Sequence, residues 1–272
     1  MTRNTTMTIG NKFFDFSNTG YIMGILNVTP DSFSDGGKFT QVDLAVKHAL
    51  KMIEEGASII DIGGESTRPG HDILDAESEI QRVVPVIQAL KKLTHVPLSI
   101  DTSKSQVAEA AILAGASLIN DVWGFKKDPH LASVAAKYNV PCCLMHNRSH
   151  QNYESLIKDI ISDLKESIQL ALDAGLDTSQ IILDPGIGFA KTLDDNLMTM
   201  KHLEEITNLG YPVLLGTSRK SMIGLTLDLP VDQRLEGTLA TTVLGYTKGC
   251  RIFRVHDVKE NLRTMLMTQA MS

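Results

Sequence analysis

Short apolar runs alternate with longer segments of helical periodicity along most of the chain. Eight such runs are rich in Ile, Val and Leu and do not alternate between apolar and polar positions. That pattern is typical of parallel strands that are buried on both faces. The predicted strands are Tyr21–Leu26, Ile59–Ile62, Pro97–Ile100, Ser117–Ile119, Val140–Met145, Ile181–Leu183, Val213–Gly216 and Ile252–Val255.

The segments between these runs carry apolar residues at helical spacing, and several end at a glycine, where a helix stop is expected. Eight strand–helix units average roughly 31 residues each, the size of one βα repeat. The predicted helices are Val42–Glu55, Ala76–Leu93, Lys104–Ala114, Pro129–Tyr138, Tyr153–Ala174, Leu193–Leu209, Asp232–Thr247 and a last one after His256.

Polar residues distinguish a closed barrel from an open, doubly wound sheet, which would place its ligand at one switch point. A polar residue lies at the C-terminal end of each of the eight predicted strands, which favours a ring with one shared mouth. These residues are Asn27, Asp61, Asp101, Asn120, His146, Asp184, Ser218 and Arg254. We therefore predict a single (β/α)₈ TIM barrel domain over residues 1–272, with an N-terminal β-hairpin at Thr8–Phe16 closing the barrel floor.

Composition narrows the class of protein. The net charge of −6 argues against a broad nucleic-acid surface, because phosphate neutralisation needs clustered Lys and Arg. An odd number of cysteines, with Cys142 and Cys143 adjacent in an apolar run, predicts reduced core thiols. The sequence has neither an uncharged apolar stretch of about 18 residues nor the apolar core of a signal peptide. We expect a cytoplasmic enzyme.

Two connections on the predicted catalytic face are long and rich in Gly, Pro, Ser and Asp. They follow the first and second strands, at Asn27–Phe39 and Asp61–Gly70. Ordinary turn chemistry explains the glycines, but it does not explain an apolar Phe33 or an Arg68 beside a proline on a loop tip. We interpret both connections as loops that close over substrate.

Six motifs resemble the dihydropteroate synthase family: NVTPDSFSDGG, DIGGESTRPG, IDTSKSQVAEAAILAGASLINDVWG, ILDPGIGFAKT, GTSRKSMIG and FRVHDV. The resemblance extends from about Ile22 to Val258. It implies that a dihydropterin methyl diphosphate is condensed with 4-aminobenzoate, with Mg²⁺ as cofactor, sulfonamides as inhibitors and a homodimer as the assembly. Two rivals remain: a pterin-dependent methyltransferase, and a catalytically silent paralogue that binds pterin.

The resemblance assigns pterin recognition to Asp101, Asn120, Asp184 and Lys220. A carboxylate at Asp184 can accept two hydrogen bonds from the amidine-like edge of a pterin. Two alternatives stay open at this point. Asp101 can instead cap the helix that begins near Lys104, and Lys220 can be a solvated charge.

Diphosphate binding is assigned by the resemblance to Asn27, Thr67, Arg68, Arg254 and His256, with Asn27 also ligating Mg²⁺ through its amide oxygen. Asp31 and Asp35 are further candidates on the first loop. TIM barrels often bind phosphate after strands seven and eight, where Arg254 and His256 lie. The alternative for Arg254 is an ion pair with Asp257. The group expected to promote catalysis is Asn27, Arg68, Lys220, Arg254 and His256.

The 4-aminobenzoate pocket is assigned, again by resemblance, to Phe33, Thr67, Pro69, Phe189 and Ser221. Phe189 can pack on an aromatic ring, or it can be an ordinary core residue. Arg219 can contact the pterin or pair with an acid, and His146 can line the site or be structural.

Overall fold

Eight parallel strands form a ring in the computed structural model, which describes residues 4–28, 38–65 and 74–272. They are β3 (Tyr21–Asn27), β4 (Ile59–Gly63), β5 (Leu98–Asp101), β6 (Leu118–Asp121), β7 (Cys142–Met145), β8 (Ile181–Asp184), β9 (Leu214–Leu215) and β10 (Ile252–Val255). The pairing order is β8-β7-β6-β5-β4-β3-β10-β9. A parallel bridge between Leu183 and Val213 joins the two edges. The closed barrel is therefore confirmed over the open sheet.

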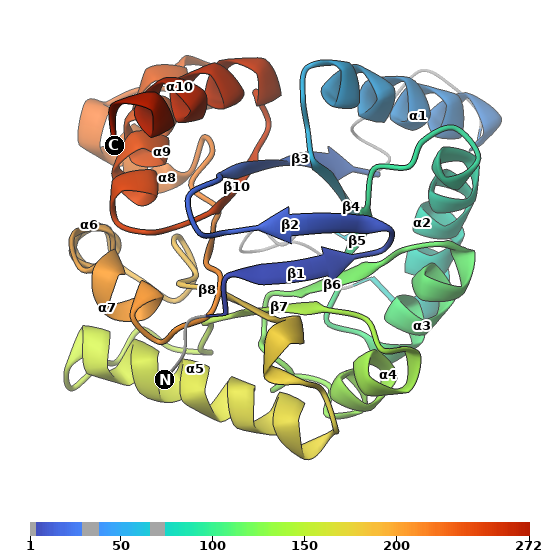
Figure 1. Cartoon of the computed structure of the whole chain (residues 1–272), viewed down its shortest axis with the longest axis horizontal. Helices are drawn as coiled ribbons and strands as arrows, with labels where there is room; N and C mark the ends of the chain where they lie inside the picture. Colours follow the sequence, from blue (N-terminus) through green and yellow to red (C-terminus); the bar gives the residue numbers. More distant parts are fainter. Residues whose placement is uncertain (1–3, 29–37, 66–73) are drawn as a thin grey trace.

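Helices surround the ring of strands (Figure 1). They are α1 (Lys38–Glu54), α2 (Ala76–Lys91), α3 (Ser105–Ala114), α4 (His130–Tyr138), α5 (Leu156–Asp173), α6 (Leu193–Lys201), α7 (Leu203–Thr207), α8 (Ser221–Leu227), α9 (Leu235–Thr247) and α10 (Val258–Met271), with short 3₁₀ turns at η2 (Thr178–Gln180) and η3 (Val231–Gln233). The predicted helix at Leu193–Leu209 is interrupted at His202, and α8 was not predicted. The seven residues of α8 are too few to display a helical period in the sequence.

An antiparallel hairpin, β1 (Thr6–Ile9) and β2 (Lys12–Asp15), crosses one end of the ring, as predicted (Figure 1). One face of the hairpin points into the barrel because side chains alternate along a strand. Its four inward side chains pack against interior side chains from seven of the eight strands. The hairpin contributes Met7, Ile9, Phe14 and Phe16, and the strands contribute Met23, Ile59, Leu118, Cys143, Ile182, Leu214 and Ile252.

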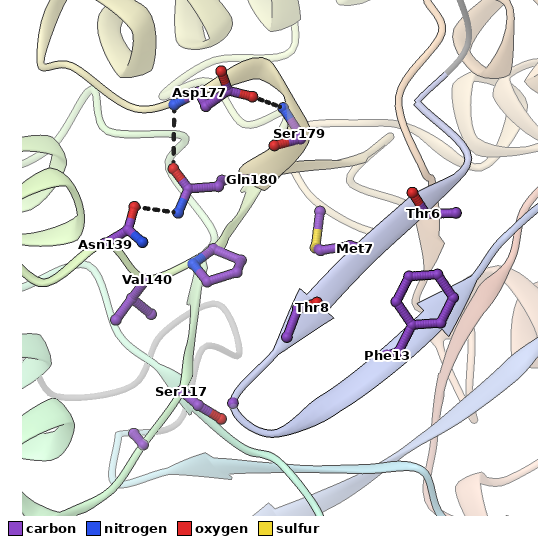
Figure 2. A pocket seen from close by; sticks show the side chains of 13 residues that line it. Thr6, Met7, Thr8, Phe13, Ser117, Asn139, Val140, Asp177, Ser179 and Gln180 are labelled. Carbon is purple, nitrogen blue, oxygen red and sulfur yellow. Dashed lines mark hydrogen bonds between the residues drawn. The ribbon is translucent and has the colours of Figure 1, made fainter.

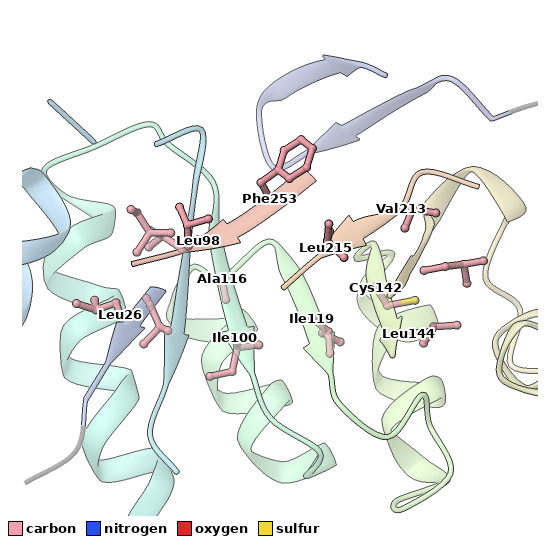
Figure 3. Close-up of a cluster of buried hydrophobic side chains, with 14 of the residues drawn as sticks. Leu26, Leu98, Ile100, Ala116, Ile119, Cys142, Leu144, Val213, Leu215 and Phe253 are labelled. Atoms are coloured by element: carbon pink, nitrogen blue, oxygen red, sulfur yellow. The ribbon is translucent and has the colours of Figure 1, made fainter. Parts of the chain in front are cut away.

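The larger hydrophobic core lies between the outer face of the strands and the helices. Figure 3 shows Ile100, Ile119 and Leu144 from three consecutive strands in this layer. Cys142 lies in the same layer and Cys143 in the barrel interior, and all three cysteines are free and buried, as predicted. Within the described ranges, no helix has the length and apolar character needed to cross a membrane.

A cavity of about 600 Å³ lies beside the hairpin, at the end of the barrel where the strands begin (Figure 2). Its walls come from the hairpin and from the segments that precede β6, β7 and β8. Among the lining residues are Gly10 in the hairpin turn, Ser117, and Gln180, whose amide nitrogen bonds Asn139 at 2.9 Å. The polar strand ends lie at the opposite end of the barrel, so this cavity is separate from the candidate site.

Candidate active site

Polar side chains from several strands gather at the carboxyl end of the barrel. Asn27, Asp101 and Asp184 are the last residues of β3, β5 and β8. Asn120 lies one residue before the end of β6, and Asp61 lies in the middle of β4. Because β4 continues to Gly63, Asp61 lies two residues before the end of its strand and deeper in the barrel than the strand-end residues.

Arg254 on β10 connects two of these carboxylates. Its Nε donates to Asp61 Oδ2 at 2.6 Å, and its Nη2 donates to Asp101 Oδ2 at 2.7 Å. Asn120 Nδ2 donates to the same Asp61 oxygen at 2.9 Å. Four strands are thereby tied together by charge-assisted hydrogen bonds across the mouth of the barrel.

The two carboxylates remain only partly satisfied. Asp61 Oδ1 and Asp101 Oδ1 are buried and have no hydrogen-bond partner among the described residues. Burial, together with the nearby Asp61 carboxylate, raises the pKa of Asp101 to about 7 against the opposing effect of Arg254. Buried acceptors without a donor are uncommon and often belong to binding sites. This pair suits a ligand that presents several N–H donors.

Asp184 and Lys220 form the other half of the site. Asp184 Oδ1 accepts a hydrogen bond from the Gly186 backbone N–H at 2.7 Å. Burial raises the pKa of Asp184, whereas the Lys220 ammonium and that N–H lower it. Lys220 Nζ donates to the carbonyl of Ile187 and lies 4.6 Å from the centre of the Phe189 ring. With both contacts, Lys220 is not a solvated charge, and burial lowers its pKa to about 8.

Asn27 lies close to Asp101 across the strand between them. A Cβ added to Gly63 would lie 3.6 Å from Asp101 Oδ2 and 3.9 Å from Asn27 Oδ1. The side chain of Asn27 is exposed at the mouth, where its amide oxygen is available to a hard cation. His256, just beyond β10, lies 3.0 Å through Nδ1 from Ser218 Oγ.

Three open alternatives are resolved by contacts. Asp101 is not the cap of α3, because Lys104 occupies the N-cap position and Asp101 Oδ2 accepts a hydrogen bond from Arg254 instead. The alternative partner of Arg254 was wrong, because Asp257 pairs with Arg219, whose Nε lies 2.9 Å from Asp257 Oδ2. His146 is a structural histidine, buried between Asp163 and Lys191.

The predicted 4-aminobenzoate residues are only partly described. Phe189 is half-buried beside Lys220, and Ser221 is the exposed first residue of α8. The predictions for Asp31, Phe33, Asp35, Thr67, Arg68 and Pro69 lie outside the described residues.

Sequence reasoning missed an ion-pair cluster of Lys104 with two glutamates beside the second long connection. Lys104 Nζ donates to Glu79 Oε2 at 2.6 Å and also to Glu65 Oε2. Glu79, on α2, is 1% exposed, and Arg82 from the same helix donates to the carbonyl of Gly64 at 3.0 Å. These contacts hold the segment through Glu65 against α2 and α3. The sequence around Lys104 did not predict these ion pairs, because Glu65 and Glu79 are distant from it in sequence.

Comparison with known proteins gives a consistent picture. The model of the family described as pterin binding enzyme matches residues 23–256. A dihydropteroate synthase of Clostridium beijerinckii is 63% identical over 263 residues, covering 96% of this chain and 98% of the relative. One from Bacillus subtilis is 59% identical over 250 residues, covering 92% and 88%.

Solved structures of dihydropteroate synthases have the same fold. One from Clostridium difficile, determined with pteroic acid, has a TM-score of 0.93 and 51% identity, covering 95% of this chain and 98% of its own. One from Xanthomonas albilineans with 4-aminobenzoic acid has a TM-score of 0.93 and 41% identity, covering 98% of both chains.

Proposed function

Since the chain belongs to the pterin-binding enzymes, among the dihydropteroate synthases, we propose that it joins (7,8-dihydropterin-6-yl)methyl diphosphate to 4-aminobenzoate. The products are 7,8-dihydropteroate and diphosphate, and one domain over residues 1–272 carries the activity. The observation that supports this most strongly is the buried carboxylate of Asp184, which interacts with Lys220 and shares the carboxyl end of the barrel with the partly satisfied pair of Asp61 and Asp101.

Pterin recognition follows from the donors and acceptors at the mouth. The amidine-like edge of the ring offers an amine and a ring N–H, and Asp184 accepts both as a carboxylate accepts an arginine. Asn120 and Asp101 serve other ring nitrogens. Lys220 donates to the ring carbonyl and to the nitrogen nearest the reacting carbon. Asp101, Asn120 and Asp184 lie at or next to strand ends, and Lys220 lies at the start of α8, so the barrel holds these groups in place before the ligand arrives.

The chemical step is the departure of diphosphate from the methylene carbon. 4-Aminobenzoate is neutral at its amine near pH 7 and needs no general base, and the enamine-like ring stabilises the cation as the bond breaks. Arg254 and His256 stabilise the negative charge that grows on the leaving group. Thr67 and Arg68 would serve the same anion. The catalytic group therefore comprises Asn27, Arg68, Lys220, Arg254 and His256.

Mg²⁺ fits the donor chemistry at the mouth. Asn27 offers a neutral amide oxygen, and Mg²⁺ prefers oxygen ligands, keeps several waters and shares substrate phosphates. Bound there, Mg²⁺ would neutralise charge on the diphosphate. No group of three or more His, Cys, Asp or Glu residues suited to a metal occurs in the described part of the chain. Substrate oxygens and water would therefore complete the coordination beside Asn27.

The arylamine pocket uses Phe189 and Ser221 beside Lys220, together with Phe33, Thr67 and Pro69 from the two long connections. Phe189 provides an apolar face for a benzene ring. A sulfonamide complex has been solved for the Yersinia pestis dihydropteroate synthase, which is 42% identical to this chain with a TM-score of 0.90. We extend that property to this enzyme and propose that sulfonamides compete for the arylamine pocket.

Diphosphate release is the measurement that tests the reaction. The purified enzyme with pterin diphosphate and Mg²⁺ should release diphosphate only when 4-aminobenzoate is present, and removal of Mg²⁺ with a chelator should abolish release. A pterin-dependent methyltransferase or a silent paralogue would release none with the full mixture. Release that is independent of 4-aminobenzoate would instead indicate a hydrolase.

We propose a homodimer through α8, α9 and α10. The α8 and α9 helices lie in contact, because a Cβ on Gly237 of α9 would lie 2.3 Å from Ile223 of α8. The α9 and α10 helices are joined by a hydrogen bond from Thr242 Oγ1 to Asn261 Oδ1 at 2.7 Å. Large apolar side chains are exposed on all three: Leu225, Leu227, Val243, Leu244, Leu266, Met267 and Met271. Exposed apolar patches of this kind mark interfaces.

Sedimentation equilibrium should give twice the chain mass for the wild type. Leu225→Glu combined with Leu266→Glu should shift the population towards monomer, because two charges would be buried without partners. Leu113→Glu is the matched control, since Leu113 is exposed on α3. A monomeric wild type, or a double variant that stays dimeric, would contradict this interface.

A further inference from the structure

Lys191, in the motif ILDPGIGFAKT, has no role in the reaction described above, yet its side chain is buried. Lys191 is 6% exposed, and its ammonium has three donors. These meet three acceptors: Gly186 O at 3.0 Å, Phe189 O at 3.2 Å and His146 Nδ1 at 2.8 Å. Burying an ammonium is costly unless it is fully bonded, and burial lowers the pKa of Lys191 to about 7. Such an arrangement needs a compensating benefit.

His146 holds the lysine from the other side. His146 is 1% exposed, and its Nε2 lies 3.1 Å from Asp163 Oδ2 on α5. Because Lys191 donates to Nδ1, the neutral ring carries its proton on Nε2 and donates it to Asp163. Burial lowers the pKa of His146 to about 4, which keeps the ring neutral near pH 7. Asp163 is fixed in turn by Arg148 Nε at 2.6 Å.

The segment between β8 and α6 depends on such external bonds. Gly186 and Ala190 have positive φ angles of 68° and 46°. A Cβ on Gly186 would lie 1.9 Å from the His146 carbonyl oxygen, so the segment lies directly on the end of β7. The hydroxyl of Tyr153 donates to the Ala190 carbonyl at 2.8 Å. A conformation that is unfavourable for the isolated backbone is held here by surrounding groups.

This segment carries the groups that contact Lys220. The Ile187 carbonyl accepts a hydrogen bond from Lys220, and the Phe189 ring lies 4.6 Å from Lys220 Nζ. Lys191 bonds the carbonyls of Gly186 and Phe189, which flank that stretch. Loss of these two bonds would let the Phe189 ring move relative to Lys220.

We propose that Lys191, held by His146 and Asp163, is a positioning residue that sets Phe189 against Lys220 and thereby determines affinity for the arylamine substrate. The proposal rests on the proposed function in one respect, that Phe189 forms a wall of the arylamine pocket. The competing role is electrostatic: the Lys191 charge lowers the pKa of Asp184, so it would support the ionised carboxylate and hence pterin binding. The two roles predict different kinetic effects.

Steady-state kinetics of Lys191→Met distinguish them. Methionine keeps an unbranched side chain that is one atom shorter, and it removes all three donors. The KM for 4-aminobenzoate should rise about tenfold, as expected for loss of a buried, charge-assisted hydrogen-bond group. The KM for pterin diphosphate should change by less than about twofold. Lys201→Met, on exposed α6 surface, is the matched control and should change neither value.

A double-mutant cycle tests whether Lys191 acts through Phe189. In a Phe189→Ala background, Lys191→Met should add less than about twofold to the KM for 4-aminobenzoate. An equal tenfold effect in both backgrounds, or a rise confined to the pterin diphosphate KM, overturns the proposal. If Lys191→Met does not fold, Tyr153→Phe takes its place in the cycle. This variant removes only the hydrogen bond from the Tyr153 hydroxyl to the Ala190 carbonyl. It should raise the 4-aminobenzoate KM about threefold.

Diphosphate release by the wild type distinguishes a failure of the positioning role from a failure of the proposed function. A wild type that releases no diphosphate with 4-aminobenzoate overturns the proposed function and the inference with it. Wild-type turnover with unchanged kinetics in folded Lys191→Met, or in Tyr153→Phe where Lys191→Met is unfolded, overturns the positioning role alone.

Discussion

Replacing Asp184 with asparagine should weaken the binding of a dihydropterin by about 2–4 kcal/mol, the range for breaking a buried charge-assisted pair. The Gly186 N–H lies 2.7 Å from Asp184 Oδ1 and needs an acceptor, so the amide oxygen of the variant should face Gly186. The new amide N–H₂ then points towards the site, where a donor would meet the donors of the pterin edge.

Calorimetry with a dihydropterin that lacks the diphosphate measures this loss directly, because no contact at the diphosphate contributes. The expected Kd increase is about 30-fold to 1,000-fold. Asp194→Asn, the same chemical change at an exposed position on α6, should leave the Kd unchanged. Unchanged binding by a folded Asp184→Asn would remove Asp184 from the pterin site.

Arg254→Ala should lower the free energy of unfolding by about 3–5 kcal/mol near pH 8, since it leaves buried carboxylates without their cation. Burial alone would lower the pKa of Arg254, but Asp61 and Asp101 raise it above its ordinary value. The guanidinium thus stays charged. Removing it sets Asp61 and Asp101 against each other with no neutralising charge between them.

The loss should depend on pH in a defined direction. The pKa of Asp101 is raised from 3.8 to about 7, so between these values the native state binds more protons than the unfolded state. Stability therefore falls as pH rises through that window. Without Arg254 the pKa of Asp101 should rise further, which extends the window upward. The destabilisation should consequently be smaller at pH 5.5 than at pH 8.

Urea denaturation at both pH values provides the measurement. Arg263→Ala, at an exposed position on α10, is the control and should change stability by no more than about 0.5 kcal/mol. A loss below about 1 kcal/mol at pH 8 would mean that the ion pairs do not stabilise the barrel. A large loss that is equal at both pH values would contradict the predicted protonation of Asp101 instead. Diphosphate release by the folded variant should also fall, because the guanidinium supports the leaving group.

Local pattern predicted most of the scaffold. Each predicted apolar run lies in the ring, because an unbroken apolar run records burial on both faces of a strand. Prediction failed where a segment was too short to show a period, as at α8, or where one pattern covered two helices, as at Leu193–Leu209. The break at His202 has no Pro or Gly to mark it.

Strand-end position and family resemblance identified Asp101, Asp184 and Lys220, which the fold brings to one mouth. The ion pairs and hydrogen bonds within the site could not be predicted from the sequence. Arg254 and Asp61 are 193 positions apart, and no local signal links them. Lys191 and His146 are 45 positions apart, and each has an ordinary local context. Pairings of this kind arise from the closure of the ring, so they become visible only in three dimensions.

The hairpin at the floor of the barrel determines where substrates enter and products leave. Ile9 and Phe14 are fully buried against interior side chains such as Met23 and Ile59, so in the described part of the chain the hairpin closes this end of the barrel. Both substrates and both products must therefore use the same opening. Diphosphate and dihydropteroate each occupy space that the next pterin diphosphate requires, so the order in which products leave determines when the next cycle can begin.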